Sequence, residues 1–178
     1  AYSKSYIQMA NQHLIQNGKV YTPQFRYIIE LLTREENRLV KKIHKRRKNF
    51  KVRTQDCTTE EERQKILRSH YPILERLDED KIELGTSGWK ARYYSKVFPI
   101  ESQHEMRTIV LRWCKTLRWN LEYYFTGCPQ QDWVYGYHAM PCVSDIHQVL
   151  EREKGFDFSQ FKFKKGIPHS PLVQLLSI

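Results

Sequence analysis

The sequence predicts a mainly α fold: an irregular helical domain with a long central amphipathic helix and aromatic-rich loops. Two long segments repeat apolar residues at intervals of three and four positions, which is the spacing of a helix buried along one face. Residues that start or stop helices flank both segments, and the aromatic stretch 130–145 is irregular rather than strand-like. With 178 residues, of which 40% are hydrophobic, the chain is long enough to bury one core.

Residues 1–50 are expected to form two helices. Mixed helical spacing predicts a short helix over residues 6–14, and Asn17-Gly18 then supplies a turn. Thr22 is expected to cap a second, longer helix in which Pro23 takes the first position. Apolar residues at a period near 3.6 continue this second helix over residues 25–43.

Residues 51–88 are interpreted as a variable linker followed by a helix. A run of Lys and Arg extends over residues 41–53. We interpret this run as a solvated face or linker rather than an RNA-facing patch, because no aromatic residue interleaves it before Phe50. Thr58 or Thr59 is expected to cap a helix that begins at residues 60–62 (EEE), where acidic side chains suit the positive end of the helix dipole. Pro72 should interrupt it, and residues 85–88 are expected to turn.

The long central helix is predicted over residues 104–125. Gly127 is its natural C-terminal cap, and Pro129 prevents continuation. Ser144-Asp145 is expected to cap the next helix. The apolar stripe of the central helix consists of Met106, Val110, Trp113, Leu117, Leu121 and Tyr124. Because the helix packs along this stripe, Trp113 and Trp119 are interpreted as packing residues.

A compact segment of Phe and Lys follows at residues 154–165. Its rings could stack on nucleotides, but large apolar rings are usually buried. We therefore expect Phe156, Phe158, Phe161 and Phe163 to pin a loop onto the domain.

Charge and cysteine content narrow the class of protein. The net charge of +10 favours a polyanionic partner, with RNA, DNA and an anionic membrane surface all possible on charge alone. No apolar stretch is long enough to cross a bilayer, and no signal segment opens the chain, so we expect an intracellular protein without a membrane partner. Cys57, Cys114, Cys128 and Cys142 are expected to be reduced thiols, because their spacing matches neither a disulfide scaffold nor a zinc template.

Three aromatic blocks interleaved with Lys and Arg are the most specific feature of the sequence: residues 88–94 (GWKARYY), 123–129 (YYFTGCP) and 133–141 (WVYGYHAMP), followed by Ser144-Asp145. Rings and cations jointly hold bases and phosphates, so the blocks indicate a nucleic-acid surface. In this order, they resemble the second conserved region of XRN-type 5′→3′ exoribonucleases, which reads G-W-K-x-R-Y-Y, then W-x-L-x-Y-Y-Y-x-G-C-P-S-W-x-W-Y-x-P-Y-H-Y-A-P-x-x-S-D. Residues 163–168 and 171–176 resemble the family's F-x-x-G-x-P and P-x-x-Q-L, and Asn17-Gly18 weakly resembles an upstream motif.

The resemblance has departures within the aromatic loop. The first Trp of the family's S-W-x-W is replaced by Gln131, and only the second is kept, as Trp133. Gly136 stands where the family usually has Pro, and Ala139-Met140 replaces Y-A. The loop is therefore less aromatic than in the family, and the chain resembles a divergent member.

The resemblance implies a role in degrading 5′-monophosphorylated RNA from its 5′ end. Residues 1–178 would form a single region, the middle helical domain of a longer enzyme, and this domain would shape the channel through which RNA enters. Within it, residues 1–50 would form the N-terminal helices, residues 51–88 the variable linker and helix, and residues 89–178 the aromatic core. Catalysis in the family uses divalent metal ions (Mg or Mn) held by acidic residues of an N-terminal catalytic half, which would be the partner of this chain. No catalytic or metal-binding residue is therefore expected here.

The nucleic-acid-binding residues implied by the resemblance are Trp133, Tyr137, His138, Lys90 and Arg92. For Trp133, stacking on RNA and a role as a core anchor stay open, with a preference for RNA because it is expected in a loop. The alternative for the whole chain is a non-catalytic basic helical module, derived from the same family, that binds RNA or serves as a scaffold.

Overall fold

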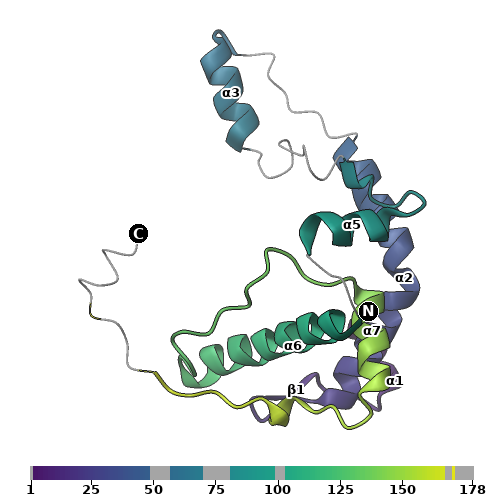
Figure 1. The fold of residues 1–178 in the computed structure, drawn as a ribbon, viewed down its shortest axis with the longest axis vertical. Helices are drawn as coiled ribbons and strands as arrows, with labels where there is room; N and C mark the ends of the chain where they lie inside the picture. The colour runs from purple at the N-terminus through teal and green to yellow at the C-terminus, as the bar shows by residue number, and fades with distance from the viewer. Residues whose placement is uncertain (1, 49–56, 70–80, 99–102, 167–169, 171–178) are drawn as a thin grey trace. The chain divides into compact units, whose positions relative to one another are not determined.

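The computed structural model describes residues 2–48, 57–69, 81–98, 103–166 and 170, and most of these residues are helical, which confirms the predicted fold class (Figure 1). The chain divides into two compact units. The first unit contains Ala1–Thr33 and Glu101–Ile178, and the second contains Arg34–Ile100. The long helix α2 (Thr22–Lys48) begins in the first unit and continues into the second. The finer division of the sequence at residues 50 and 88 stays a prediction.

The N-terminal segment of the first unit is a helix followed by a small hairpin. Helix α1 (Tyr2–Gln8) ends earlier than predicted, because Ala10 and Asn11 have φ angles of 50° and 60° that no helix continues through. The predicted turn at Asn17-Gly18 is confirmed; it joins the antiparallel strands β1 (Ile15–Gln16) and β2 (Lys19–Val20). Strands of two residues are too short to leave an alternating pattern in the sequence.

Helix α2 begins at Thr22, as its Thr-Pro start signal predicts, but Thr22 does not have the expected capping role. Its hydroxyl instead donates to Asp157 Oδ2 at 2.7 Å and accepts from the backbone N–H of Phe158 at 3.4 Å. Because Thr22 is already the first residue of the helix, its side chain is free to tie α2 to this distant segment. Phe25 and Ile29, on the next turns, are buried in the core.

Helix α6 (Gln103–Thr126) confirms the predicted central helix and forms the spine of the core. Val110 and Cys114 are fully buried, and Trp113 packs against the core from its edge. Tyr124 contradicts the predicted stripe, because it is 83% exposed on the last turn of α6, beyond the part of the helix that packs. Gly127 ends the helix as predicted, with φ +92° and its N–H donated to the Tyr123 carbonyl. The buried cluster consists of Phe25, Ile29, Val110, Cys114, Ile146, Val149, Leu150, Phe156 and Phe158.

Helix α7 (Val143–Arg152) packs on α6 and buries Ile146, Val149 and Leu150. Its N-cap is Cys142, so Ser144-Asp145 lies inside the first turn rather than at the predicted cap. There the Asp145 carboxylate suits the positive end of the helix dipole. At the other end of α7, the Arg26 guanidinium donates to the carbonyls of Leu150 and Glu153 at 2.5 and 2.6 Å. It thereby satisfies the Leu150 acceptor that the helix itself leaves open, whereas the Glu153 carbonyl also accepts from the Phe156 N–H.

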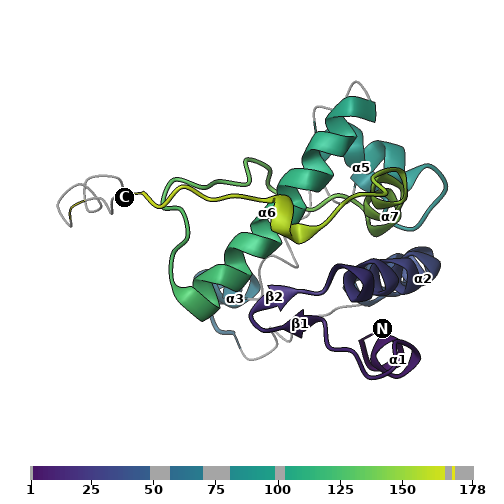
Figure 2. The ribbon, with the colours of Figure 1, turned by 90° about the horizontal axis from the view of Figure 1, so that it is seen from below.

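The segment after α7 confirms the prediction that phenylalanines pin it to the domain. Phe156 and Phe158 are buried, and Phe161 packs against the core from outside. A short 3₁₀ helix, η1 (Phe158–Gln160), is held by Asp157, whose carboxylate accepts from the N–H of Ser159. Helix α6 contacts η1 and strand β2 (Figure 2). Farther along the chain, Phe163 lies near Lys115 of α6 and meets Trp133 edge to face.

The second unit contains helices α3 (Glu60–Ser69) and α5 (Trp89–Val97). Thr59 caps α3 as predicted, because its hydroxyl accepts from the Glu62 N–H at 3.2 Å, and the Glu62 carboxylate reaches back to the N–H of Thr58 at 3.1 Å. The expected interruption at Pro72 lies outside the described residues. The predicted turn over residues 85–88 is confirmed and leads directly into α5.

Within the described ranges, no helix combines the length and the apolar character that crossing a membrane requires.

Candidate nucleic-acid interface

The loop over residues 130–142, which joins α6 to α7, carries the ring of Trp133 to the outer side of α6. The indole N–H lies 3.3 Å from the hydroxyl of Thr116, and the ring is half-buried. Phe163 approaches the ring edge to face, with the two centres 6.4 Å apart. Trp133 is therefore held in one position by the helix on one side and by the C-terminal segment on the other.

Two cations of α6 lie over this ring. Lys115 Nζ is 4.2 Å from the centre of the Trp133 ring and 5.2 Å from the centre of Phe163. The Arg112 guanidinium carbon lies 5.7 Å from the Trp133 centre, and its Nη2 donates to the carbonyl of Val134 at 3.1 Å. Cation–π contacts of this kind place positive charge directly beside an aromatic face. We call Arg112, Lys115, Trp133 and Phe163 the cation–aromatic cluster.

The glycine that departs from the family pattern has a structural role in this cluster. Gly136 has a φ of +81°, a conformation that the proline usual in the family cannot adopt, because the proline ring fixes φ near about −65°. A Cβ at this position would also lie 3.4 Å from Arg112 Nη2. The replacement of proline by glycine therefore lets the loop turn where the Arg112 side chain reaches it.

A second aromatic group continues from the cluster toward the end of α6. The rings of Trp119 and Tyr123 are stacked, 5.4 Å apart with an angle of 9° between their planes, and the Trp119 N–H donates to the Gln130 carbonyl at 2.8 Å. Tyr123, Tyr124 and Phe125 are 50%, 83% and 59% exposed. Trp119 thus ties the loop to α6, while its stacked partner presents an aromatic surface to solvent.

The other two predicted site residues of this loop follow Trp133 closely. Tyr137 is half-buried and meets Tyr135 edge to face at 5.2 Å, and His138 is exposed. The structure places Trp133, Tyr137 and His138 on one loop of the first unit, as the sequence implied. Their role in binding nucleic acid stays a prediction.

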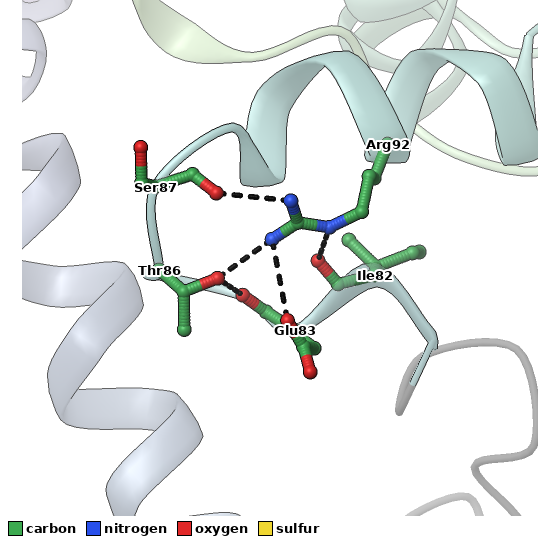
Figure 3. A network of polar contacts seen from close by, with 5 residues as sticks. All are labelled: Ile82, Glu83, Thr86, Ser87 and Arg92. Atoms are coloured by element: carbon green, nitrogen blue, oxygen red, sulfur yellow. Dashed lines mark hydrogen bonds and ion pairs between the residues drawn. The ribbon is translucent and has the colours of Figure 1, made fainter.

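Lys90 and Arg92 belong to the second unit, on α5. The Arg92 guanidinium donates to the Ile82 and Ser87 carbonyls at 2.8 and 2.9 Å and to the Thr86 hydroxyl at 2.6 Å, with the Glu83 carboxylate 3.7 Å away (Figure 3). These contacts show that Arg92 organises the turn that precedes α5. Contact with RNA by Lys90 and Arg92 stays a prediction.

The turn that Arg92 braces is packed closely. Gly85 has a φ of +83°, and a Cβ there would lie 2.8 Å from the side chain of Lys41 and 3.0 Å from its Cα. The Trp89 indole N–H lies 3.3 Å from Asn37 Oδ1, and both Trp89 and Phe98 are buried. The aromatic block at residues 88–94 therefore contributes to the packing of the second unit.

The cysteine and acidic side chains show what chemistry the described part of the chain can support. Cys57, Cys114, Cys128 and Cys142 are free thiols, and burial raises the pKa of the Cys114 thiol to about 12. In the described ranges, no group of three or more His, Cys, Asp or Glu side chains could hold a metal ion.

Sequence reasoning missed the cations that stand beside Trp133. Lys115 and Arg112 lie outside the aromatic motifs, on a helix whose apolar stripe predicts packing. A helical register groups them on one face of α6 but does not show that Trp133 lies against that face. The series 112, 115, 119, 123 and the series 112, 116, 119, 123 both advance by three or four residues, so these positions share one face of α6, away from Val110, Cys114 and Leu117 on the core side.

Comparison with known proteins now identifies the family. The model of the Xrn1 helical domain matches residues 73–178, which is more than half of the chain and includes α5, α6, the loop with Trp133 and α7. The chain belongs to the Xrn1 helical domain family. The family assignment confirms the resemblance that the aromatic blocks carry.

Named relatives come from plants, animals and fungi. The chain is 35% identical to 5′-3′ exoribonuclease 2 of Arabidopsis thaliana over 105 residues, covering 57% of this chain and 10% of the relative. It is 34% identical to 5′-3′ exoribonuclease 2 of Gallus gallus over 102 residues, covering 56% and 10%. It is 31% identical to 5′-3′ exoribonuclease 1 of Schizosaccharomyces pombe over 136 residues, covering 72% and 10%. The chain thus spans about a tenth of the length of these relatives.

Proposed function

We propose that this chain is the helical middle segment of an intracellular 5′→3′ exoribonuclease that degrades 5′-monophosphorylated RNA, and that its loop over residues 130–142 lines the channel through which RNA enters. One observation carries the proposal: within the region that matches the Xrn1 helical domain, Trp133 is half-exposed and has two cations over its ring. A ring in such surroundings can stack on a base, while the neighbouring cations attract the phosphates.

Hydrolysis itself is assigned to another part of the enzyme. Two-metal phosphodiester hydrolysis needs several convergent carboxylates, and the described residues hold no such group. The divalent metal, Mg or Mn, would supply an activated water and neutralise the leaving oxygen in a catalytic half that packs against this chain. We assign to Trp133, Tyr137 and His138 the binding and orientation of the RNA.

A non-catalytic RNA-binding or scaffold module of the same family is the second candidate. The departures from the family pattern at Gln131, Gly136 and Ala139-Met140 favour it, because they remove aromatic and rigid residues from the loop. In this case the longer protein would bind RNA without shortening it.

The two candidates are separated by the full-length protein that contains this chain. Purified with Mg²⁺ and given RNA with a 5′ monophosphate, it should release nucleotides from the 5′ end, whereas the isolated 178-residue chain should release none. Binding of RNA without hydrolysis by the full-length protein would support the scaffold, and hydrolysis by the isolated chain would contradict the assignment of the metal site to another part.

A further inference from the structure

We propose that Lys115 and Arg112, on the outer face of α6, bind backbone phosphates of single-stranded RNA beside Trp133. The inference rests on the proposed function, because it takes the loop over residues 130–142 as an RNA contact. It adds the phosphate ligands, which lie on the helix and not in the aromatic motifs.

Lys115 holds a positive charge that the described residues leave uncompensated. Its ammonium lies against the rings of Trp133 and Phe163, and no described carboxylate forms an ion pair with it. Contact with an aromatic face fixes the position of a cation without cancelling its formal charge. A half-buried ammonium of this kind gains more from an incoming phosphate than a fully hydrated one does.

Arg112 also has hydrogen-bond donors available for a phosphate. It is exposed, and its one hydrogen bond to the Val134 carbonyl leaves further N–H groups of the guanidinium for another acceptor. The planar guanidinium fork suits a phosphate, which can accept two parallel hydrogen bonds from it. Arg112 and Lys115 are three positions apart on one helix and therefore neighbours on its surface.

Other arginines of the first unit have their charge or their donors engaged within the fold. Arg118 is paired with the carboxylate of Glu122 and also donates to the Phe158 carbonyl. Arg107 forms two hydrogen bonds with the Glu153 carboxylate, at 2.5 and 3.1 Å. Arg26 serves the C-terminal carbonyls of α7. Arg112, with one hydrogen bond and no ion pair within the described residues, differs from these three arginines and lies over the Trp133 ring.

The same face of α6 continues into an aromatic surface. Tyr123, stacked on Trp119 and half-exposed, lies three helical turns beyond Arg112, a separation of roughly 16 Å at 1.5 Å per residue. Cations at one end and stacked rings at the other suit a single strand, whose phosphates and bases alternate along its length. An acidic protein surface would use the cations alone, so the rings favour RNA.

The test is the salt dependence of RNA binding by the chain. A fluorescent single-stranded oligouridylate is titrated with the wild type and with the variants Lys115→Gln, Arg112→Gln and Lys115→Arg, at several KCl concentrations. Lys154→Gln is the matched control, because Lys154 is an exposed lysine of the same unit that lies over neither the Trp133 ring nor the Phe163 ring. Each lost phosphate contact should reduce the slope of log affinity against log salt by roughly 0.7.

We expect Lys115→Gln and Arg112→Gln each to show this reduced slope, Lys115→Arg to keep the wild-type slope, and Lys154→Gln to leave the slope unchanged. Because the Arg112 side chain is exposed, Arg112→Gln should leave the fold intact. Its slope therefore tests the proposal even if Lys115→Gln loosens the loop. An unchanged slope in both Gln variants would overturn the proposal, and so would an equal reduction in Lys154→Gln, which would indicate diffuse attraction.

Two further arms separate this inference from the proposed function. Trp133→Ala in the same titration should weaken binding; if it does not, RNA does not lie at this loop and the proposed function loses its contact. If Trp133→Ala weakens binding while the Gln variants keep the wild-type slope, only the phosphate assignment fails. Displacement of the RNA by polyglutamate at equal charge would identify an acidic-protein surface and overturn the proposal.

Discussion

Lys115 Nζ lies 4.2 Å from the centre of the Trp133 ring, and the Trp133 N–H lies 3.3 Å from the hydroxyl of the next residue on α6, Thr116. One turn of the helix therefore fixes both the position and the orientation of the indole. Trp133 anchors the loop to α6 and remains half-exposed with cations over its ring, while its stacking on RNA stays a prediction. An anchored ring loses little further freedom when a base stacks on it.

Arg26→Ala should destabilise the first unit by about 2 kcal/mol, because it leaves the Leu150 carbonyl at the end of α7 without a donor and the Glu153 carbonyl with the Phe156 N–H alone. Urea unfolding followed by circular dichroism measures this cost. Arg107→Ala is the matched control: it removes a solvent-screened ion pair to the same residue, Glu153, and should cost about 1 kcal/mol or less. Equal costs for the two variants would contradict the capping role of Arg26.

The Cys114 thiol should resist labelling in the folded chain. Its pKa of about 12, raised by burial, keeps it protonated at pH values near 8, and the thiolate is the reactive form. Cys57 and Cys128 are half-exposed and should react with iodoacetamide, while Cys114 should react only after unfolding in urea. Mass spectrometry of the labelled peptides locates the modified residues, and rapid labelling of Cys114 under native conditions would contradict its buried position.

Asp157 should contribute to stability at neutral pH and lose this contribution in acid. Hydrogen bonds from Ser159 and Thr22 hold the pKa of its carboxyl below the usual value. Since the pKa is lower in the folded than in the unfolded state, the contribution is complete above the unfolded value and disappears as pH falls through the folded one, below about pH 4.

The comparison of wild type with Asp157→Asn isolates this effect. The difference in their free energies of unfolding should be largest near neutral pH and should shrink in acid. The pKa of Glu153 is also held low, by Arg107, but this pair is present in both proteins and cancels in the difference. A difference that stays constant from neutral pH into acid would contradict the account.

Gly136→Ala should destabilise the loop by roughly 1–2 kcal/mol, because position 136 has a φ of +81° that side chains disfavour, and the new Cβ would crowd Arg112. Gly155→Ala provides the control, since a Cβ at Gly155 meets nothing within 4 Å. Thermal unfolding of the two variants measures the effect. Equal melting temperatures would show that the loop does not depend on the left-handed conformation.

Much of the fold was predictable because the long helices leave a periodic signal. Helix α6 shows the three-and-four spacing of its buried face, and Gly127 ends it where a left-handed residue is required. The stripe failed at Tyr124 because periodicity describes one helix and not the length over which a partner covers it. Helix α5 is not among the helices that the sequence predicts, because its aromatic block resembles a binding motif.

The candidate site was predictable only where the motif names its residues. Trp133, Tyr137 and His138 could be placed on one loop from the sequence, but Lys115 and Phe163 could not, because they come from α6 and from the segment after η1. Arg92 shows the converse. The motif marks it as a possible RNA contact, whereas the structure shows a guanidinium bonded to the turn before its own helix (Figure 3).

Replacing Trp113 should lower the stability of the fold, whereas replacing Trp133 should lower the affinity for RNA. Trp113 packs against the buried cluster beside Phe25, so Trp113→Ala should cost on the order of 3 kcal/mol of stability. Its RNA affinity per folded molecule should match the wild type. A weakened affinity at equal folded fraction would show that the core side of α6 also contributes to binding.

The most direct measurement of the central claim is the rate at which the full-length protein shortens 5′-monophosphorylated RNA when Trp133 is replaced by Ala. Loss of about 1–3 kcal/mol of base stacking should slow the reaction roughly 5- to 150-fold per folded molecule. Trp133→Phe, which keeps an aromatic face, should retain most of the rate. If Trp133→Ala instead lowers the melting temperature strongly and leaves the rate per folded molecule unchanged, Trp133 is an anchor of the loop and not a contact of the RNA.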